Sequence, residues 1–351
     1  MKQQIKIFGA ALDPLNSPER LNLKLAYLNF LRKEPEANKH SDPYDAMKEY
    51  LRKKMPFLDG NAWFGKMQVE SWLTPKPKLT DIHLLNTETF TNFLNKNGCW
   101  DYALRISDYV EQKILPSKPV MIGVDHSLTG GVIMALSSQY NNLNVIVLDA
   151  HFDALRYQGL KANNQLACSN NYLKNEYLKK GDEIQFYECG NFISYLLDQK
   201  VIKPENLWIL GVQDGILDSL KMQYNRSKAE LSQTKEYMKW IKKGVHLVTK
   251  TDFVSKNFHL DLTGPTYISF DMDVGSLSSV YSARFMNCVG LTYKEFIKSI
   301  HKLSGIVRKS NIPCVGLDIM EIDIHLLEIA ELSQYQDHSR QIMKEIFQAF
   351  L

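Results

Sequence analysis

The last two-thirds of the chain alternates short apolar runs with longer stretches of helical periodicity, which severely limits the folds it can adopt. Several runs are apolar on both faces, as in a parallel sheet covered by helices. The expected strands are Pro119–Gly123, Leu143–Asp149, Asn206–Val212, Val245–Thr249, Thr266–Asp271 and Pro313–Asp318. The expected helices are Thr129–Ser138, Ile193–Lys200, Lys228–Lys242 and Thr292–Lys309. This alternation predicts a three-layer α/β/α fold with a mostly parallel central sheet.

The first 118 residues or so are less regular. Ile5–Phe8 is expected to be an edge strand or the first strand, and Ser17-Pro18 begins a helix with proline in its first turn. Lys54–Pro77 holds several prolines and has no assignable periodicity. The remaining helices are expected at Asp45–Lys53, Thr87–Ile114 and His338–Leu351. Because no linker is recognisable, we predict one domain over residues 1–351, with an elaborated N-terminal part (about 1–118) and a functional core at about 119–325.

Composition narrows the class of protein. The formal net charge is only +3, so a nucleic-acid partner is not indicated. Apolar stretches such as Val145–Leu148 are far shorter than the roughly 20 residues of a membrane helix. The N-terminus lacks the apolar region of a signal peptide. Five scattered cysteines without a C-x-x-C pair fit a reducing compartment. We therefore expect a soluble cytoplasmic protein without a membrane partner.

Polar residues follow one apolar strand at alternate positions. Val145–Leu148 runs into Asp149, His151 and Asp153. Side chains two residues apart on a strand share a face, so these three can converge at the strand's carboxyl end, where α/β folds bind ligands. On its own, the pattern is equally consistent with a helix cap followed by a surface turn.

Two further strands end in the same way. Tyr267–Phe270 leads into Asp271 and Asp273. Two carboxylates on one face repel each other and are costly to bury without a cation. Alone, the pair could equally be a solvated strand end. Pro119–Gly123 is followed by His126, which alone could be a structural histidine. In a parallel sheet all three motifs meet at one edge. Together they supply two imidazoles and four carboxylates, a set suited to two divalent cations such as Mn²⁺.

These motifs resemble the three signatures of the arginase/agmatinase (ureohydrolase) family, which are G-G-D-H-S, D-A-H-x-D and S-F-D-x-D. Val124 stands where the first signature has its second glycine. Gly290–Glu295 and Gly316–Glu321 are similar to the arginase segments G-L-T-Y-R-E and G-L-D-I-M-E. The resemblance covers roughly residues 119 to 321. It implies an arginase-like fold and a metal-dependent hydrolase that acts on linear amidines.

The resemblance also implies roles for individual residues. One Mn²⁺ would be held by His126, Asp149, Asp153 and Asp271. The other would be held by Asp149, His151, Asp271 and Asp273. Glu321 would pair with the substrate's guanidinium, and Asp153 would pass a proton to the leaving amine. The histone-deacetylase branch shares the fold but usually keeps one zinc, and the presence of His126 and Asp153 favours two metals.

The chain departs from the arginase pattern in four places. Gln165–Asn171 lacks the family's proton-shuttle histidine, and Ala154–Leu166 lacks recognisable groups for the α-amino and α-carboxylate ends of free arginine. Ser276-Leu277 replaces an Asp-Pro, and Asp323-Ile324 replaces an Asn-Pro. The six expected metal ligands and Glu321 thus match the arginase pattern, whereas the residues that bind the α-groups of free arginine are not recognisable.

This combination predicts a two-manganese hydrolase that releases urea and converts arginine to ornithine, with arginine inside a peptide as the favoured substrate. The long N-terminal part, with Trp63 and Trp72, would then line a peptide groove or serve only as a packing layer. An agmatinase or formimidoylglutamase of a small substrate is one alternative. A catalytically silent binding protein of the same fold is another. A homo-oligomer is compatible with all of them.

Overall fold

The computed structural model of the chain describes residues 4–34, 39–56, 58, 60–154, 187–213, 235, 237–285, 289–332 and 337–351. Within these residues the chain forms one eight-stranded sheet in the order β2-β1-β3-β8-β7-β4-β5-β6. The strands are β1 (Ile5–Ala10), β2 (Trp63–Lys66), β3 (Lys118–Gly123), β4 (Asn144–Leu148), β5 (Leu207–Val212), β6 (His246–Thr249), β7 (Thr266–Asp271) and β8 (Cys314–Met320). Every neighbouring pair is parallel.

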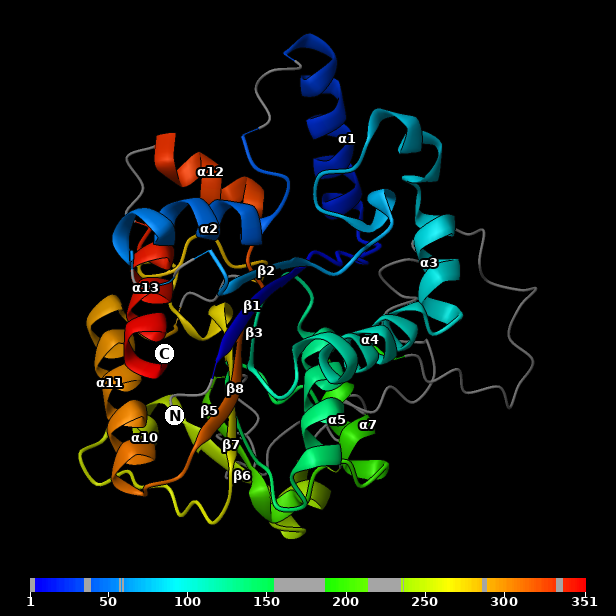
Figure 1. The fold of residues 1–351 in the computed structure, drawn as a ribbon. Helices are drawn as coiled ribbons and strands as arrows, with labels where there is room; N and C mark the ends of the chain where they lie inside the picture. The colour runs from blue at the N-terminus through cyan, green and yellow to red at the C-terminus, as the bar shows by residue number, and fades with distance from the viewer. Residues whose placement is uncertain are drawn as a thin grey trace, which may run out of the picture.

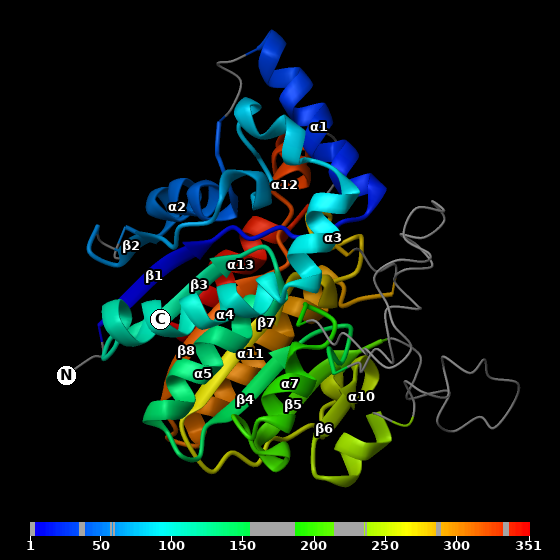
Figure 2. The same cartoon turned by 90° about the vertical axis from the view of Figure 1, so that its right-hand side faces the viewer.

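Helices cover both faces of the sheet, which confirms the predicted three-layer α/β/α fold (Figure 1). In Figure 1, α10, α11 and α13 lie on one side of the sheet and α4, α5 and α7 on the other, and Figure 2 shows the latter face. The α-helices are α1 (Pro18–Lys33), α2 (Pro43–Lys54), α3 (Thr87–Asn95), α4 (Gly98–Tyr109), α5 (Thr129–Gln139), α7 (Phe192–Asp198), α10 (Lys250–Val254), α11 (Tyr293–Lys309), α12 (Ile324–Leu332) and α13 (Ser339–Phe350).

The central strands are apolar on both faces because each face packs on its own layer of helices. In β4, Val145 and Val147 belong to the core shared with α4 and α5, whereas Ile146 and Leu148 belong to the core shared with α11 and α13. All five residues of β4 are buried. This explains why the strands appear in the sequence as continuous apolar runs rather than as alternating patterns.

Local signals place several helix ends where the sequence predicts them. The side chain of Ser17 accepts a hydrogen bond from the backbone N–H of Arg20 and caps α1. Thr292 and Glu295 form the predicted capping box at the start of α11. Most of the helix expected at Lys228–Lys242 lies outside the described residues, and residues 237–242 are helical.

The N-terminal part differs from expectation at the edge of the sheet. Ile5–Ala10 is the first strand of the chain but not an edge strand, because it pairs with β3 on one side and β2 on the other. The edge strand β2 lies within the unassigned segment Lys54–Pro77. It has only four residues, and only one of them is fully buried, so no alternating pattern long enough to recognise is present.

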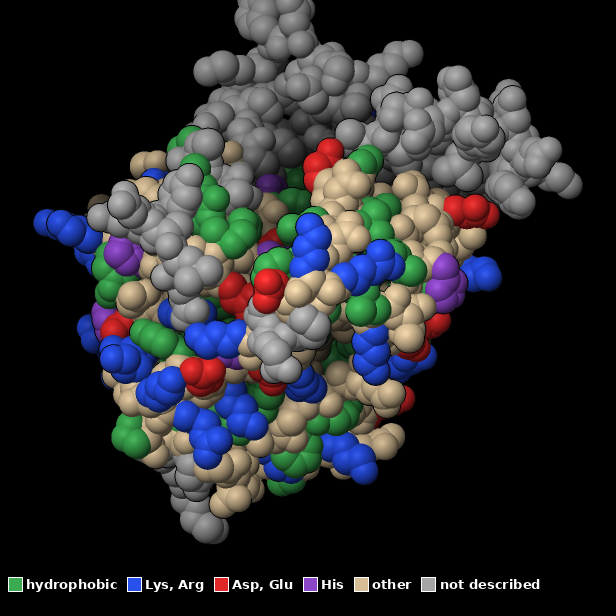
Figure 3. All heavy atoms as spheres, turned by 90° about the horizontal axis from the view of Figure 1, so that it is seen from above, with side chains coloured by type: hydrophobic (Ala, Val, Ile, Leu, Met, Phe, Trp, Pro, Cys, Tyr) green, Lys and Arg blue, Asp and Glu red, His purple; other side chains and the backbone are tan. Residues whose placement is uncertain are grey.

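No helix among the described residues is long and apolar enough to span a bilayer. On the face of the molecule seen in Figure 3, lysine and arginine side chains are interspersed with acidic and uncharged ones among the residues that are described. This distribution agrees with the small net charge of the sequence.

Candidate metal centre

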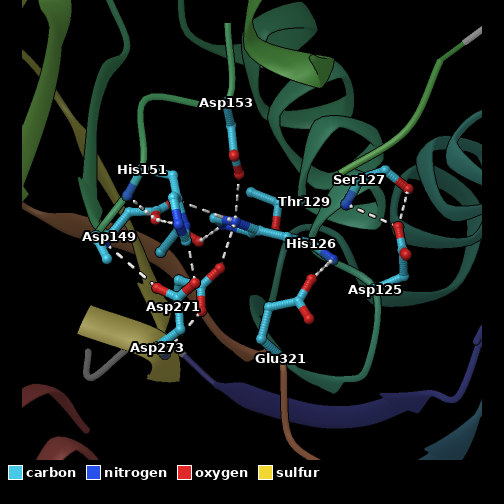
Figure 4. Close-up of polar contacts among 12 residues, drawn as sticks. Asp125, His126, Ser127, Thr129, Asp149, His151, Asp153, Asp271, Asp273 and Glu321 are labelled. Carbon is cyan, nitrogen blue, oxygen red and sulfur yellow. Dashed lines mark hydrogen bonds and ion pairs between the residues drawn. The ribbon is translucent and has the colours of Figure 1, made fainter. Parts of the chain in front are cut away.

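The candidate site lies at the carboxyl edge of four adjacent strands. His126 begins the short helix η5 (His126–Leu128) after β3, and Asp149 follows β4 directly. Asp271 is the last residue of β7 and caps the helix η8 (Met272–Val274), while Glu321 follows β8. Since β3, β8, β7 and β4 are neighbours in the sheet, residues from distant parts of the chain converge here (Figure 4).

One group of side chains gathers around the imidazole of His126. Its Nδ1 lies 2.9 Å from Asp271 Oδ2, 3.0 Å from Asp153 Oδ2 and 3.3 Å from Asp149 Oδ2. One ligand atom from each of the four residues lies within 4.8 Å of the others. All four residues are buried. This is the group that the resemblance assigns to the first metal ion.

A second group shares Asp149 with the first. His151 Nδ1 lies 2.9 Å from Asp273 Oδ2 and 3.6 Å from Asp149 Oδ1. Ligand atoms of these three residues also lie within 4.8 Å of one another. Asp271 Oδ1 accepts a hydrogen bond from the backbone N–H of Asp273 at 2.9 Å, so it joins the two groups structurally. The His151 side chain is 40% exposed, which makes it the solvent-facing side of the centre.

A hydrogen-bond chain behind His126 orients its ring. Ser269 Oγ lies 2.9 Å from His126 Nε2 and donates to Asp318 Oδ1 at 2.6 Å. Because the serine hydroxyl is used as a donor to Asp318, it accepts a hydrogen bond from Nε2–H, which leaves Nδ1 facing the carboxylates. Thr129 Oγ1 donates to the other Asp318 oxygen at 2.6 Å, and the Tyr267 hydroxyl donates there too.

The pKa values of the cluster show that it requires positive charge. Burial, together with the Asp271 and Asp149 carboxylates, raises the pKa of Asp273 to about 8. Burial and Asp149 also raise the pKa of Asp153 well above its ordinary value. Although burial opposes a charged ring, Asp271 and hydrogen bonds to the carboxylates raise the pKa of His126. Protons thus occupy a cluster whose carboxylates would otherwise repel one another.

The donor set fits two divalent cations. Four carboxylates and two imidazoles converge, and the carboxylate oxygen Asp149 Oδ2 is buried without a hydrogen-bond partner. A buried carboxylate oxygen that lacks a donor is costly unless a cation faces it. Oxygen-rich ligation with some imidazole is typical of Mn²⁺ and related divalent ions.

The structure brings together all six residues singled out as metal ligands, and it places Glu321 beside them. The Glu321 carboxylate is 1% exposed and accepts a hydrogen bond from the backbone N–H of His126 at 3.0 Å. Most of Ala154–Leu166 and all of Gln165–Asn171 lie outside the described residues, so those two departures remain observations on the sequence.

Some residues that contribute to the site do not stand out in the sequence. Ser269 and Asp318 lie inside the quoted S-F-D and G-L-D segments, so the signal was present although their function as supports was not recognised. Arg284, whose guanidinium lies 3.3 Å from Glu321 Oε2, was missed altogether. It belongs to no quoted motif, and its partners are remote in the sequence.

Fold and site together define an α/β protein with a buried carboxylate–imidazole centre of the kind that holds divalent cations. The model of the arginase family matches residues 76–331, most of the chain. The chain therefore belongs to the arginase family.

Curated arginases share part of the sequence. An arginase from Staphylococcus aureus (strain COL) is 33% identical over 106 residues, which are 30% of this chain and 30% of that protein. An arginase from Staphylococcus aureus (strain MRSA252) is 30% identical over 150 residues, which are 42% of this chain and 44% of that protein. These matches span less than half of the relatives' length.

Solved structures share the fold over nearly the whole chain. Arginase from Bacillus subtilis subsp. subtilis str. 168 has a TM-score of 0.53 at 15% identity, covering 100% of this chain and 98% of that one. A putative agmatinase from Clostridium difficile has a TM-score of 0.52 at 17% identity, covering 99% and 98%. A proclavaminate amidino hydrolase from Streptomyces clavuligerus has a TM-score of 0.51 at 16% identity, covering 99% and 91%. At such identities the likeness concerns the fold alone.

Proposed function

We propose that this chain is a two-manganese hydrolase that cleaves a guanidino group and releases urea. The observation that carries the proposal is the convergence of two ligand groups that share Asp149, with the buried carboxylate of Glu321 beside them. Membership of the arginase family supports the same chemistry.

The two ions would be held as the family resemblance implies. His126 and Asp153 belong to the first ion, His151 and Asp273 to the second, and Asp149 and Asp271 to both. When bound, a pair of such ions would lower the pKa of water to near neutrality and so supply a hydroxide nucleophile. Four carboxylates balance the charge of two divalent cations.

Two side chains of the protein act on the substrate itself. Glu321 would supply the carboxylate that orients a planar guanidinium cation, and burial keeps water from competing for it. Burial also raises the pKa of Glu321, whereas the positive charge of Arg284 opposes that shift, as an arriving guanidinium would. Asp153 lies 3.0 Å from His126 in the same cluster and, as the family resemblance implies, would pass a proton to the leaving amine. The exposed edge at His151 is the side from which a substrate would arrive.

We further propose that the preferred substrate is arginine within a polypeptide, which would be converted to ornithine. The support is the sequence between Ala154 and Asn171, in which the residues that arginases use for free α-amino and α-carboxylate ends are not recognisable. A charged head group that enters an unmatched pocket loses hydration without compensation. A peptide backbone at the same place is neutral and needs only ordinary hydrogen bonds.

The test compares substrates that differ only at the α-groups. Urea release is measured with Mn²⁺ on free arginine, Nα-acetyl-arginine amide and a short arginine-containing peptide, with agmatine and formimidoylglutamate alongside. If the proposal holds, the blocked and peptide substrates exceed free arginine by about tenfold or more in kcat/KM, the effect of one unmatched polar group. Faster turnover of free arginine or agmatine than of every peptide would refute the peptide preference.

Controls separate the remaining alternatives. A peptide with lysine in place of arginine should release no urea, and the metal-ligand variant Asp271→Asn should lose activity on every substrate. Two bound Mn²⁺ with no turnover of any guanidino compound would instead identify a catalytically silent binding protein.

A further inference from the structure

A second group of buried charges lies at the same sheet edge, around Arg284. Its members come from the N-terminal part, from the loop after β3 and from the segments around β8. We call it the Arg284 network, and it comprises Asp13, Arg20, Lys24, Asp125, Arg284, Glu321 and Asp323. Six members are at least nine-tenths buried, and the Arg20 side chain is 12% exposed. Glu321 thus belongs both to this network and to the proposed substrate site.

The guanidinium of Arg284 faces three carboxylates. NH1 lies 3.2 Å from Asp125 Oδ2 and 3.3 Å from Glu321 Oε2, and NH2 lies 3.6 Å from Asp13 Oδ1. NH1 also donates a hydrogen bond to the carbonyl oxygen of Val124 at 2.8 Å. Its side chain has no exposed surface. The planar guanidinium has several N–H donors that can face several carboxylates at once, whereas a lysine ammonium is a single point of charge.

The backbone reinforces this pairing. The N–H of Arg284 donates to the carbonyl oxygen of Glu321 at 2.8 Å, and Ala283 forms an isolated antiparallel bridge with Ile322. Glu321 has a φ of 59°, a left-handed conformation that is unfavourable for a residue with a side chain. The segment that carries Glu321 is therefore held in one place by its contacts with the segment that carries Arg284.

The N-terminal part holds the other side of the guanidinium. Asp13 Oδ2 pairs with Arg20 NH2 at 2.9 Å, and Lys24 Nζ donates to the carbonyl oxygen of Asp13 at 2.8 Å. Arg20 also pairs with Asp323, two residues after Glu321. Asp323 is one of the positions at which the chain departs from the arginase pattern, so the departure coincides with a contact to α1.

A metal ion is not the natural occupant of this region. Ligand atoms of Asp125, Cys189 and Glu321 lie within 4.8 Å of one another, as a cation site would require. However, Arg284 NH1 lies within 3.3 Å of both carboxylates and already supplies the positive charge. Glu321 Oε1 accepts a hydrogen bond from the N–H of His126, whereas Oε2 is buried without a hydrogen-bond partner and faces Arg284 NH1 at 3.3 Å, so both oxygens can accept a further donor.

We propose that Arg284, anchored by Asp13, is a positioning residue that holds the Glu321 carboxylate in the orientation that receives a substrate's guanidinium. This proposal rests on the proposed function, in which Glu321 is the substrate's partner. Arg284 does not contact the metal cluster through any of its described ion pairs. Its loss should therefore affect substrate binding far more than metal binding.

The first experiment replaces Arg284 with alanine and adds guanidinium ion. Arg284→Ala should raise KM for the best substrate by at least about tenfold, the effect of one misaligned charge-assisted hydrogen bond, with Mn²⁺ content unchanged. Low-millimolar guanidinium should refill the cavity, lower KM and raise the Tm of Arg284→Ala. In the unaltered protein the same ion should only compete with substrate. Arg284→Lys should not restore KM.

The alternative is that Arg284 occupies the substrate's place and inhibits the enzyme. In that case Arg284→Ala would bind substrate more tightly than the unaltered protein, and this result would overturn the proposal. An Arg284→Ala, Glu321→Gln double variant provides a further test. If Arg284 acts through Glu321, the double variant should bind substrate no worse than Glu321→Gln alone.

A second variant tests the same proposal if Arg284→Ala does not fold. Asp13→Asn removes only the anchor and should raise KM severalfold without loss of Mn²⁺. Lys76→Met is the matched control, because it breaks a buried ion pair with Glu328 (2.6 Å) outside the network. It should lower Tm without changing KM. An Asp13→Asn variant that behaves like Lys76→Met would contradict the proposal.

The Tm measurement does not depend on turnover, so failure of the positioning proposal can be told from failure of the proposed function. If no guanidino substrate is hydrolysed, guanidinium should still raise the Tm of whichever folded variant lacks the Arg284 side chain. Asp13→Asn, which retains that side chain, should show no such rise. Stabilisation of Asp13→Asn and Arg284→Ala to the same extent would overturn the assignment of the cavity to a guanidinium.

Discussion

The metal cluster and the Arg284 network solve the same electrostatic problem in opposite ways. Both bury four carboxylates at the carboxyl edge of one parallel sheet. In the network, the cationic side chains of Arg20, Lys24 and Arg284 lie among the carboxylates. Among the described residues of the metal cluster, no lysine or arginine lies beside the carboxylates, whose partners are the two imidazoles and backbone N–H groups.

The difference appears in the pKa values of two carboxyl groups, Asp13 and Asp273. Although burial opposes ionisation, Lys24, Arg20 and Arg284 hold the pKa of Asp13 well below its ordinary range. Burial, Asp271 and Asp149 instead raise the pKa of Asp273 to about 8. Another carboxyl group in each region shifts the opposite way. Although burial opposes ionisation, His126 and His151 hold the pKa of Asp149 low, and burial raises the pKa of Glu321. A cluster that contains its own cations is a structural element, whereas one that depends on protons is prepared to exchange them for metal ions.

The largest expected effect comes from removing a carboxylate of the metal cluster. Asp271→Asn should lower Mn²⁺ affinity and urea release by at least about a hundredfold, because a neutral amide cannot balance the charge of two cations. Metal content by elemental analysis and the urea assay measure the two effects. Full occupancy together with full activity would remove Asp271 from the centre.

Asp323→Asn is the matched control from the other region. It removes one charge from the Arg284 network and should lower the free energy of unfolding by roughly 1.5–3 kcal/mol, the usual contribution of a hydrogen bond to a charged group. Both Mn²⁺ ions should remain bound. Loss of metal from this variant would mean that the two regions are not electrostatically separate.

A smaller effect is expected from the support behind His126. Ser269→Ala removes the hydroxyl that orients the ring and should lower Mn²⁺ affinity about 10–100-fold, as is typical when a partner of a ligating histidine is lost. Titration calorimetry measures it. Ser304→Ala is the control, because its hydroxyl donates to Ala349, away from the centre. Equal affinities for the two variants would argue against an orienting role.

The smallest effect concerns pH. An unfolded aspartate titrates near 3.8, whereas Asp273 in the metal-free fold retains its proton up to about pH 8. Between these values the folded state holds the extra proton, so the stability of the metal-free protein should fall as pH rises. Metal must displace that proton, and Mn²⁺ affinity should increase by at most about tenfold per pH unit for each proton released. An affinity independent of pH between 6 and 8 would contradict this prediction.

The parts that were predictable from the sequence share a local signal. Strands such as β7 are apolar runs that end in paired carboxylates, so both the strand and its functional residues follow from one short segment. The edge strand β2 was missed because four residues with mixed exposure, in a segment rich in proline, carry no such signal.

The Arg284 network could not be predicted for a different reason. Asp13 and Arg284 are isolated charges in the sequence, and such charges usually lie on a solvated surface. Only the order of strands in the sheet, with β1 inserted between β2 and β3, brings Asp13 to the site. A strand can be recognised from the periodicity of a short sequence segment. The tertiary contacts of single residues produce no such pattern in the sequence.

The position of β1 has a practical consequence for anyone who exchanges segments between members of this family. The family match begins at residue 76, yet β1 pairs along its whole length with β3, all of whose residues are buried. A shortened chain that starts at residue 76 would leave the edge of β3 unpaired, and exposed apolar edges promote aggregation. The first 75 residues should therefore be transferred together with the core in any chimera.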